Sequence, residues 1–410
     1  MAKRVAVIGA GPGGLAAARH FSTPDSQFEC QVFEQDCDLA CSWRVSEQIG
    51  MDSKGRLVHS SMYKNLRTNL PKHVMCYPEI PFDEDLSEFM TSDEVLDYFH
   101  KFADRFDLKK LIKFNHLVTE VKPVNPGQSD TSWLIKYGNL IDGLYSQEEF
   151  DAVIVANGHT TKPHWPKFDG LSTYRRNILH SHDFRDAANY KDESVLIIGG
   201  SFSAVDITMH VSKHAKTVAL SHHVEKIKAN FRSNVKQVSD VLKFETDLVH
   251  FQDGNVLEFD TVIVCTGFEY SFPFLHPDCK ITTDGYGVEP LYKHIINIEY
   301  PTMCFLILGN QVSPMQLGDL EARFCKKFLS NEKVLPSKLE MYQDLRNDQE
   351  MRQNKLGLGP RNAHKFGCLQ KAHYDDLSGT AGIAGIDPEI ARYILQASED
   401  LCVLSSESNN

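Results

Sequence analysis

The chain has no long apolar run and is short of positive charge. Within its 410 residues no stretch approaches the ~18 to 20 uninterrupted apolar residues that a membrane helix needs. Its 43 Lys and Arg are outnumbered by 55 Asp and Glu, which gives a net charge of −12. Because duplex binding depends on clustered Lys and Arg, we expect neither nucleic acid nor a membrane anchor as partner. The acidic balance would mildly favour a cationic substrate.

Paired cysteines and metal-ligand spacings are missing too. The ten cysteines include no CxxC and no Cys/His pattern of a metal site, so we expect no metal. In a chain of this length they indicate buried side chains in a reducing compartment. The residues before the apolar run at Val5 are too few for a signal peptide, and the expected localisation is cytoplasmic. At roughly 150 residues per domain, the length predicts two or three domains.

A glycine-rich turn follows the first apolar run. Gly9, Gly11 and Gly14 form GxGxxG between this run and a helix of small residues that starts near Pro12. In such a turn the first glycine permits the tight bend, the second lets a pyrophosphate approach, and the third lets the helix pack on the strand. The next expected strand ends at Glu34, whose carboxylate would bind ribose hydroxyls and repel a 2′-phosphate. This turn therefore predicts FAD or NAD.

A second turn has the pattern Gly199-x-Ser201-x-x-Ala204, again between an apolar strand and a helix. The strand after it ends without an acid, and donors or cations stand there instead: Ser221, His222, His223, Lys226 and Lys228. These groups suit the 2′-phosphate of NADPH. The two turns together predict two different dinucleotides.

Two further apolar runs, 150–158 and 259–267, repeat one another as Phe-Asp, a β-branched stretch and a terminal glycine. Runs that are apolar on both faces are typical of central parallel strands. Their order predicts an α/β protein with two Rossmann-like dinucleotide-binding domains, the NADPH domain inserted into the FAD domain. We expect the FAD domain to comprise residues 1–160 and 270–410 with a helical C-terminal tail, and the NADPH domain to comprise 161–269.

Several reactions use two dinucleotides. A disulfide reductase would need a redox-active cysteine pair, for which the spacing of Cys37 and Cys41 is poor. A dehydrogenase that oxidises NADH needs only the two folds and stays open.

Four segments resemble the flavin-containing monooxygenases. Residues 168–184 match the family's FxGxxxFxGxxxHSxxF, with Tyr174 in place of Phe and Arg176 at the internal glycine. Residues 60–72 are similar to its flavin-facing segment, and 266–275 are close to its TGYxxxFPFL. Glu321-Ala-Arg resembles the family's closing helix. The chain departs from the family at Ala40-Cys41 and at His73.

The resemblance implies an NADPH- and O2-dependent monooxygenase that forms a C4a-hydroperoxyflavin and oxygenates a tertiary amine or thioether. Such an adduct must be kept dry. Asn69 resembles the family's catalytic asparagine, and Thr68 would share its contact with NADP⁺. Insect members include alkaloid N-oxygenases, so a plant alkaloid is one expected substrate. A ketone-to-ester monooxygenase, a non-catalytic dinucleotide sensor and a homo-oligomer stay open.

The implied cofactor-binding residues lie at eight places along the chain. They are Gly9, Ala10, Gly11, Pro12, Gly13, Gly14, Glu34, Gln35, Ser42, Trp43, Thr68, Asn69, Leu70, Val121, Gly199, Ser201, Phe202, Ser203, Ala204, Asp206, Ser221, His222 and Gln316.

Overall fold

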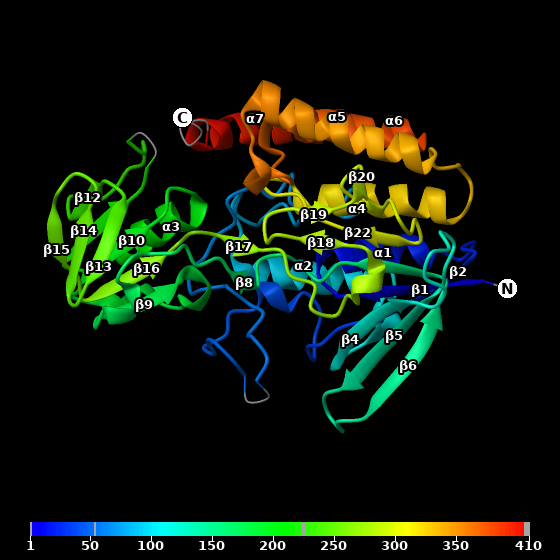
Figure 1. Cartoon of the computed structure of the whole chain (residues 1–410), viewed down its shortest axis with the longest axis horizontal. Helices are drawn as coiled ribbons and strands as arrows, with labels where there is room; N and C mark the ends of the chain where they lie inside the picture. Colours follow the sequence, from blue (N-terminus) through cyan, green and yellow to red (C-terminus); the bar gives the residue numbers. More distant parts are fainter. Residues whose placement is uncertain (1, 53–54, 224–225, 406–410) are drawn as a thin grey trace. The chain divides into compact units, whose positions relative to one another are not determined.

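Two units, one built around a mixed sheet and one around a parallel sheet, make up the computed structural model (Figure 1). The structure describes residues 2–52, 55–223 and 226–405, with side chains up to residue 396. Unit 1 comprises Met1–Cys41, Leu70–His159 and Tyr270–Glu399. Unit 2 comprises Ser42–Asn69 and Thr160–Glu269, together with the end of the chain. In sequence, unit 2 therefore interrupts unit 1, and the predicted α/β fold with an inserted dinucleotide-binding domain is confirmed.

The sheet of unit 1 has seven strands in the order β20-β21-β22-β7-β1-β2-β3. Its strands are β1 (Lys3–Ile8), β2 (Phe28–Phe33), β3 (Ile112–Lys113), β7 (Ala152–Val155), β20 (Leu291–Tyr292), β21 (Ile296–Asn297) and β22 (Met303–Phe305). The central strand β1 pairs in parallel with β2 on one side and β7 on the other. The run that contains β7 is thus the buried parallel strand that its β-branched residues predicted.

Side chains of β1 alternate between two layers, as a strand period of two requires. Ala6 and Ile8 pack into a core with Trp133 and Ile135 of a second, three-stranded sheet. This sheet and a small hairpin complete the strands of unit 1: β4 (His116–Pro123), β5 (Trp133–Asn139), β6 (Tyr145–Phe150), β18 (Thr282–Thr283) and β19 (Val288–Glu289). On the other face, Val7 lies beside the turn that opens the first helix.

The helices of unit 1 come from both ends of the chain and its middle. They are α1 (Pro12–Phe21), α2 (Ser92–Arg105), α4 (Pro314–Leu329), α5 (Lys338–Leu356) and α6 (Gln370–Ala381), and α7 (Pro388–Ser405) follows. Both α2 and α5 begin with a capping box, in which an N-cap hydroxyl and a glutamate three residues later satisfy backbone N–H groups reciprocally. The C-terminal tail, which was predicted to be helical, contains α5, α6 and α7.

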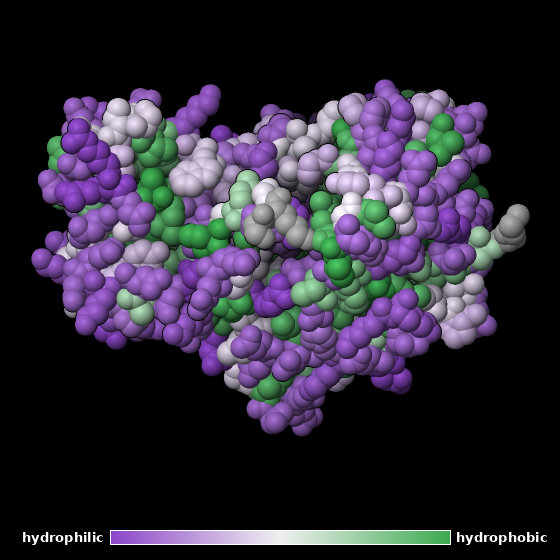
Figure 2. All heavy atoms as spheres, turned by 90° about the horizontal axis from the view of Figure 1, so that it is seen from below, coloured by the Kyte–Doolittle hydropathy of each residue, from purple (hydrophilic) through white to green (hydrophobic). Residues whose placement is uncertain are grey.

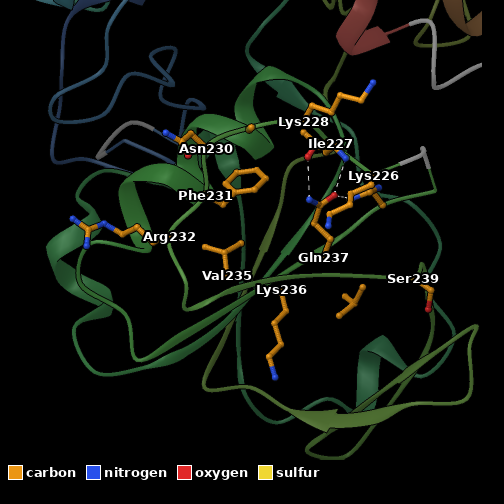
Figure 3. Close-up of a pocket in the computed structure, with 13 residues that line it drawn as sticks. Lys226, Ile227, Lys228, Asn230, Phe231, Arg232, Val235, Lys236, Gln237 and Ser239 are labelled. Carbon is orange, nitrogen blue, oxygen red and sulfur yellow. Dashed lines mark hydrogen bonds between the residues drawn. The ribbon is translucent and has the colours of Figure 1, made fainter.

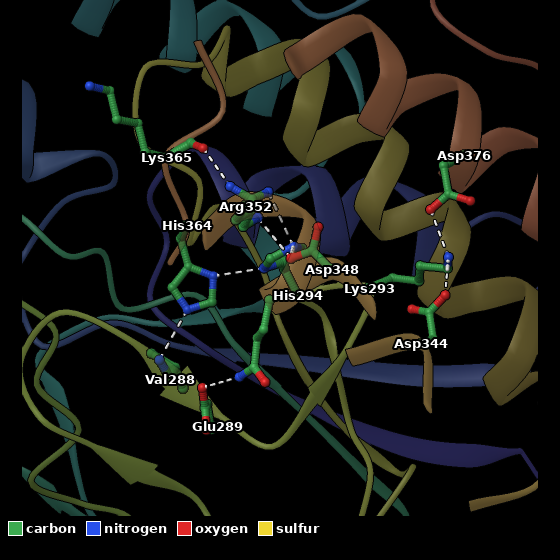
Figure 4. A network of polar contacts seen from close by, with 11 residues as sticks. Val288, Glu289, Lys293, His294, Asp344, Asp348, Arg352, His364, Lys365 and Asp376 are labelled. Carbon is green, nitrogen blue, oxygen red and sulfur yellow. Dashed lines mark hydrogen bonds and ion pairs between the residues drawn. The ribbon is translucent and has the colours of Figure 1, made fainter. Parts of the chain in front are cut away.

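A buried polar network ties α5 to the strand edge of unit 1 (Figure 4). His364 accepts the Val288 N–H at Nε2 and contacts His294 through Nδ1, each at 3.0 Å. His294 Nε2 lies 3.2 Å from the carboxylate of Asp348, which also accepts from Arg352 at 2.7 Å. Because Asp348 and Arg352 belong to α5, the network holds this polar helix where apolar contacts are few.

Unit 2 has a five-stranded parallel sheet in the order β12-β11-β10-β16-β9. Its strands and helix are β9 (Asn177–His180), β10 (Ser194–Ile198), β11 (Thr217–Ser221), β12 (Val235–Val238), β16 (Thr261–Val264) and α3 (Phe202–Val211). An antiparallel meander and a short pair add β13 (Val241–Glu245), β14 (Leu248–Phe251), β15 (Val256–Glu258), β8 (Lys162–Pro163) and β17 (Phe268–Glu269). Val195 and Ile197 of β10 pack with α3, while Leu196 and Ile198 pack with the meander.

Ser42–Asn69 belongs to unit 2, although the expected boundary placed it with residues 1–160. Its hydrogen bonds explain this, because Arg185 donates to the carbonyls of Gln48 at 2.9 Å and Ser60 at 3.0 Å. The Tyr63 hydroxyl donates to Asp206 of α3. That unit 1 holds FAD and unit 2 holds NADPH stays a prediction.

Polar side chains cover most of the face of the molecule shown in Figure 2. In the part of the chain that the structure describes, no helix has both the length and the apolar character of a membrane span.

Candidate functional site

Two of the three glycines in the first turn are required by the protein itself. Gly9 has φ +101°, and a Cβ built on it would lie 2.5 Å from the carbonyl oxygen of Ala156. A Cβ on Gly14 would lie 1.9 Å from the carbonyl oxygen of Gly9, so the helix can pack this closely only with glycine there. Both positions behave as the turn motif predicts.

No neighbouring protein atom requires a glycine at residue 11. It is the N-cap of α1 with φ −81°, a conformation open to any residue, and no atom lies within 4 Å of a Cβ built on it. The open space therefore lies directly before the N-terminus of a ten-residue helix, where unpaired N–H groups attract anions. A dinucleotide pyrophosphate fits this open space. A side chain at residue 11 would clash with such a ligand and with no atom of the protein.

Glu34 directly follows β2 and is 9% exposed. Its two carboxylate oxygens accept the N–H groups of Ala10 and Asp36, both at 2.8 Å. Burial raises the pKa of this carboxyl to about 7, although the backbone donors oppose the shift. Glu34 thus also holds the glycine turn in place, which the ribose-binding motif alone did not indicate.

The second glycine turn repeats the first in its main-chain contacts. Gly199 has φ +142°, and a Cβ on it would lie 2.4 Å from the carbonyl oxygen of Cys265, which follows β16 as Ala156 follows β7. Ser201 is the exposed N-cap of α3 and makes no side-chain cap bond. Ala204 is fully buried against the sheet, so a methyl group is accommodated where the motif has its third glycine.

A hollow of about 1040 Å³ opens beside the edge strand of unit 2 (Figure 3). It is lined by 222, 226–232 and 235–239, which include the cations Lys226, Lys228, Arg232 and Lys236. Figure 3 shows the side chains of Lys228, Arg232 and Lys236 extending away from one another. They create a positive region, but they do not converge on one point.

The predicted 2′-phosphate donors at the end of β11 are engaged within the protein. Ser221 is fully buried and its hydroxyl donates to the carbonyl of Ser239 at 2.8 Å. His222 is 8% exposed, with Nε2 2.9 Å from Gln237 Oε1. Gln237 in turn binds both backbone groups of Ile227 and so shapes the loop that lines the hollow.

Thr68 and Asn69 end the first segment of unit 2. Thr68 is 6% exposed, whereas Asn69 is exposed to solvent. Leu70, with which unit 1 resumes, is buried. An exposed amide at this point is available to a ligand, and its predicted catalytic role stays a prediction.

The other predicted cofactor residues vary in exposure. Val121 lies in the core of unit 1, and the side-chain amide of Gln316 donates to the carbonyl of Cys76 at 2.7 Å. Asp206 accepts from Tyr63, as described above. The remaining positions, Gln35, Ser42, Trp43, Phe202 and Ser203, are half-buried or exposed.

The fingerprint segment packs within unit 2. Gly170 has φ +74°, and a Cβ there would lie 1.8 Å from the carbonyl oxygen of Phe244. Phe168 and Tyr174 meet the Phe244 ring at 5.4 and 4.9 Å between ring centroids. Arg176, at the position of the internal glycine, pairs with Asp247 at 3.2 Å. These contacts give the fingerprint a structural role.

The family model described as flavin-binding monooxygenase-like matches residues 2–227 and 228–402. The chain belongs to this family. It is therefore a flavin monooxygenase, an enzyme that uses FAD and NADPH, and the resemblance inferred from the motifs is confirmed.

Individual relatives extend over most of the chain. A flavin-containing monooxygenase of Arabidopsis thaliana, FMO GS-OX4, is 31% identical over 95% of this chain and 88% of its own. Senecionine N-oxygenase of Tyria jacobaeae is 32% identical over 90% of this chain and 82% of its own. The solved structure of S-allyl-L-cysteine S-oxygenase from Allium sativum is similar with a TM-score of 0.88 at 30% identity, and covers 99% of this chain and 94% of its own.

Proposed function

We propose that this monooxygenase is an N- or S-oxygenase of small molecules, with tertiary amines, plant alkaloids among them, and thioethers as its substrate class. The proposal is supported by relatives named for an N-oxygenase and an S-oxygenase activity, each about 30% identical over most of the chain. The ketone-to-ester alternative and the non-catalytic sensor are not favoured by these relatives.

The observation that carries the cofactor assignment is the contrast between the two glycine turns. The turn of unit 1 is followed by the buried carboxyl of Glu34, which would accept ribose hydroxyls and disfavour a 2′-phosphate. The turn of unit 2 is followed by the hollow lined with Lys226, Lys228, Arg232 and Lys236. We therefore assign FAD to unit 1 and NADPH to unit 2, with residues 9–14 and 199–204 at the two pyrophosphates.

Bound FAD would supply the redox chemistry, with NADPH as the reductant and O2 as the source of the oxygen atom. The residues of the chain bind the two cofactors and orient them. The N–H groups at the start of α1 would hold the FAD pyrophosphate, and those at the start of α3 the NADPH pyrophosphate. The Asn69 amide would donate or accept a hydrogen bond without releasing a proton, which suits a reaction that acid would divert to hydrogen peroxide.

We also propose a cytoplasmic location. It is supported by the cysteine pattern of the sequence, which has no CxxC and none of the regular spacings of a disulfide-rich secreted protein.

The decisive experiment is product analysis by mass spectrometry. Purified protein that is saturated with FAD is incubated with NADPH, oxygen and one of three matched substrates: a tertiary amine, a thioether or a cyclic ketone. We expect an N-oxide or S-oxide, and NADPH oxidation that rises with the amine or thioether. A lactone from the ketone without an N- or S-oxide would contradict the proposed class, and protein that cannot bind FAD would contradict the cofactor assignment.

A further inference from the structure

Unit 1 contains one β-branched residue with a backbone conformation that such residues rarely adopt. Ile307 lies two residues after the end of β22 and has φ +54°. A positive φ is an outlier for a β-branched side chain, because its Cβ substituents crowd the backbone there. Strain of this kind persists only where the surroundings hold it, and it concentrates at functional sites.

Both backbone polar groups of Ile307 are held by side chains, one buried and one half-buried. Its N–H donates to Glu321 Oε2 at 2.7 Å, and its carbonyl oxygen lies 3.1 Å from His159 Nδ1, which must therefore carry the proton. Glu321 belongs to α4, and His159 is the last residue of its segment of unit 1. The strained residue is thus fixed from two directions.

The Ile307 side chain lies where α1 and α4 approach each other. Its Cδ1 would be 2.8 Å from a Cβ on Gly318 of α4 and 3.4 Å from a Cβ on Gly13 of α1. The same Cβ position on Gly318 is 3.7 Å from the Cα of Gly13. Ile307 therefore fills the space between the two helices directly beneath the first glycine turn.

Glu321 is an unusual residue for its position. Only 2% of it is exposed, and burial raises the pKa of its carboxyl to about 8. Burying a carboxyl group is unfavourable unless it is hydrogen-bonded. The hydrogen bond to the N–H of Ile307 gives this side chain a purpose that a leucine at the same position could not serve.

We propose that Glu321 is a positioning residue for FAD: its carboxyl group holds Ile307 in the left-handed conformation, and Ile307 thereby sets the contact of α1 with α4 under the glycine turn. This inference rests on the proposal that the glycine turn of unit 1 holds FAD. Glu321 itself would contact neither the cofactor nor the substrate. It acts through Ile307 on the helix whose N-terminus faces the pyrophosphate.

The test compares two replacements of Glu321 in apoprotein reconstituted with FAD. Glu321→Gln keeps an acceptor for the Ile307 N–H, so we expect an FAD dissociation constant close to that of the wild type. Glu321→Leu removes the acceptor, and we expect the dissociation constant to rise at least about tenfold, which corresponds to about 1.4 kcal/mol. We also expect a changed visible absorption spectrum of bound flavin in Glu321→Leu only. Equal affinities for the Leu and Gln variants would overturn the inference.

Glycine at residue 307 provides an independent arm, because glycine adopts a positive φ without strain. In the Ile307→Gly background the Glu321→Leu change should weaken FAD binding by less than about twofold, a non-additivity that a general loss of stability would not produce. The same tenfold loss in that background would overturn the inference. If Glu321→Leu alone does not fold, the double variant must be as stable as Ile307→Gly, and a further loss of stability in the double variant counts against the inference.

The parent proposal is tested separately with Gly11→Ala. If this variant binds FAD as tightly as the wild type, FAD does not occupy the glycine turn and the proposed site itself fails. If Gly11→Ala weakens binding and Glu321→Leu does not, only the role of Glu321 is removed.

Discussion

The three glycines of the first turn belong to one motif, but they are needed for different physical reasons. Gly9 and Gly14 are required by neighbouring carbonyl oxygens, while Gly11 faces open space at the start of α1. A substitution at residue 14 should therefore act on the fold, and one at residue 11 on the ligand. The two positions form a matched pair in the same turn.

We expect Gly14→Ala to lower the free energy of unfolding by about 1–3 kcal/mol or more, because the added methyl group overlaps the Gly9 carbonyl oxygen. Gly11→Ala should change it by no more than about 1 kcal/mol, the difference between these residues at an N-cap. Its FAD dissociation constant should instead rise at least about tenfold. Denaturant unfolding of the apoprotein and FAD titration measure the two effects. A Gly11→Ala variant with lower stability and normal FAD affinity would contradict this division.

Glu34 should make FAD binding depend on pH near neutrality. The pKa of its carboxyl is raised to about 7 by burial, and ribose hydroxyls would donate to the ionised form. Binding then favours the deprotonated protein, so FAD affinity should be constant well above pH 7 and fall as the pH drops through 7, by up to about tenfold per pH unit. FAD titrations across this range measure the slope. Glu34→Gln should bind more weakly with a flat profile, and an unchanged slope in that variant would exclude Glu34 as its source.

Asn69 is exposed, so its replacement should change chemistry and leave the fold intact. Asn69→Leu removes the amide, and loss of one well-placed hydrogen bond at a reacting centre costs about 10²-fold in rate. We expect substrate oxygenation to fall by this order while NADPH oxidation continues and hydrogen peroxide is released. Peroxide yield per NADPH is the measurement, and Asn69→Gln, which keeps an amide, is the comparison. Unchanged coupling in Asn69→Leu would remove Asn69 from the mechanism.

Among the elements, α5 depends most clearly on polar contacts at a distance in sequence. The Val288 N–H determines which atoms donate in this network. Because it donates to His364 Nε2, His364 carries its proton on Nδ1. His294 then accepts at Nδ1 and donates from Nε2 to Asp348. The His364 ring is thus neutral, and a proton added at its Nε2 breaks the hydrogen bond from the Val288 N–H (Figure 4). Burial, with the Arg352 cation nearby, lowers the pKa of His364 well below 6.5.

Acid should therefore loosen α5. A histidine with a depressed pKa stabilises the folded state fully above its unfolded value of 6.5, and this contribution is lost as the pH falls toward the folded pKa. We expect hydrogen exchange in α5, corrected for the intrinsic rate, to increase below about pH 6. His364→Gln can still accept from Val288 and cannot be protonated, so it should weaken this response. His100→Gln on α2, outside the network, should not, and equal responses in both variants would refute the assignment.

The elements also show where sequence patterns stop being informative. Glycine turns, the buried runs of β7 and β16, and the helices α5 and α7 were predictable because their signals are local. The contact between His294 and His364 joins residues 70 positions apart, and neither residue carries a pattern that pairs them. The left-handed Ile307 was equally unpredictable, since its cause is a carboxyl group on another element. Likewise, Ser221 and His222 have the right chemistry for a phosphate site, but tertiary hydrogen bonds already engage them.

For the molecule as a whole, the net charge of −12 is the property that no single site explains. The cations that line the hollow of unit 2 lie in a strongly acidic protein, so the long-range field should attract positive substrates while a local region serves an anionic cofactor. A protonated amine would then be drawn to the protein, and a neutral thioether would not. The two kinds of substrate in the proposed class thus differ in their electrostatic attraction to the acidic protein.

Salt separates these two cases, because the Debye length shortens from about 30 Å at 0.01 M to about 3 Å at 1 M ionic strength. At saturating NADPH, kcat/KM for a tertiary amine that is protonated at the assay pH should fall at least about threefold over this range, as expected for steered association. The neutral thioether of similar size is the internal control and should change little, since salt effects on NADPH binding or on the fold would lower both substrates together. A flat response for the amine would mean that the acidic surface takes no part in substrate capture.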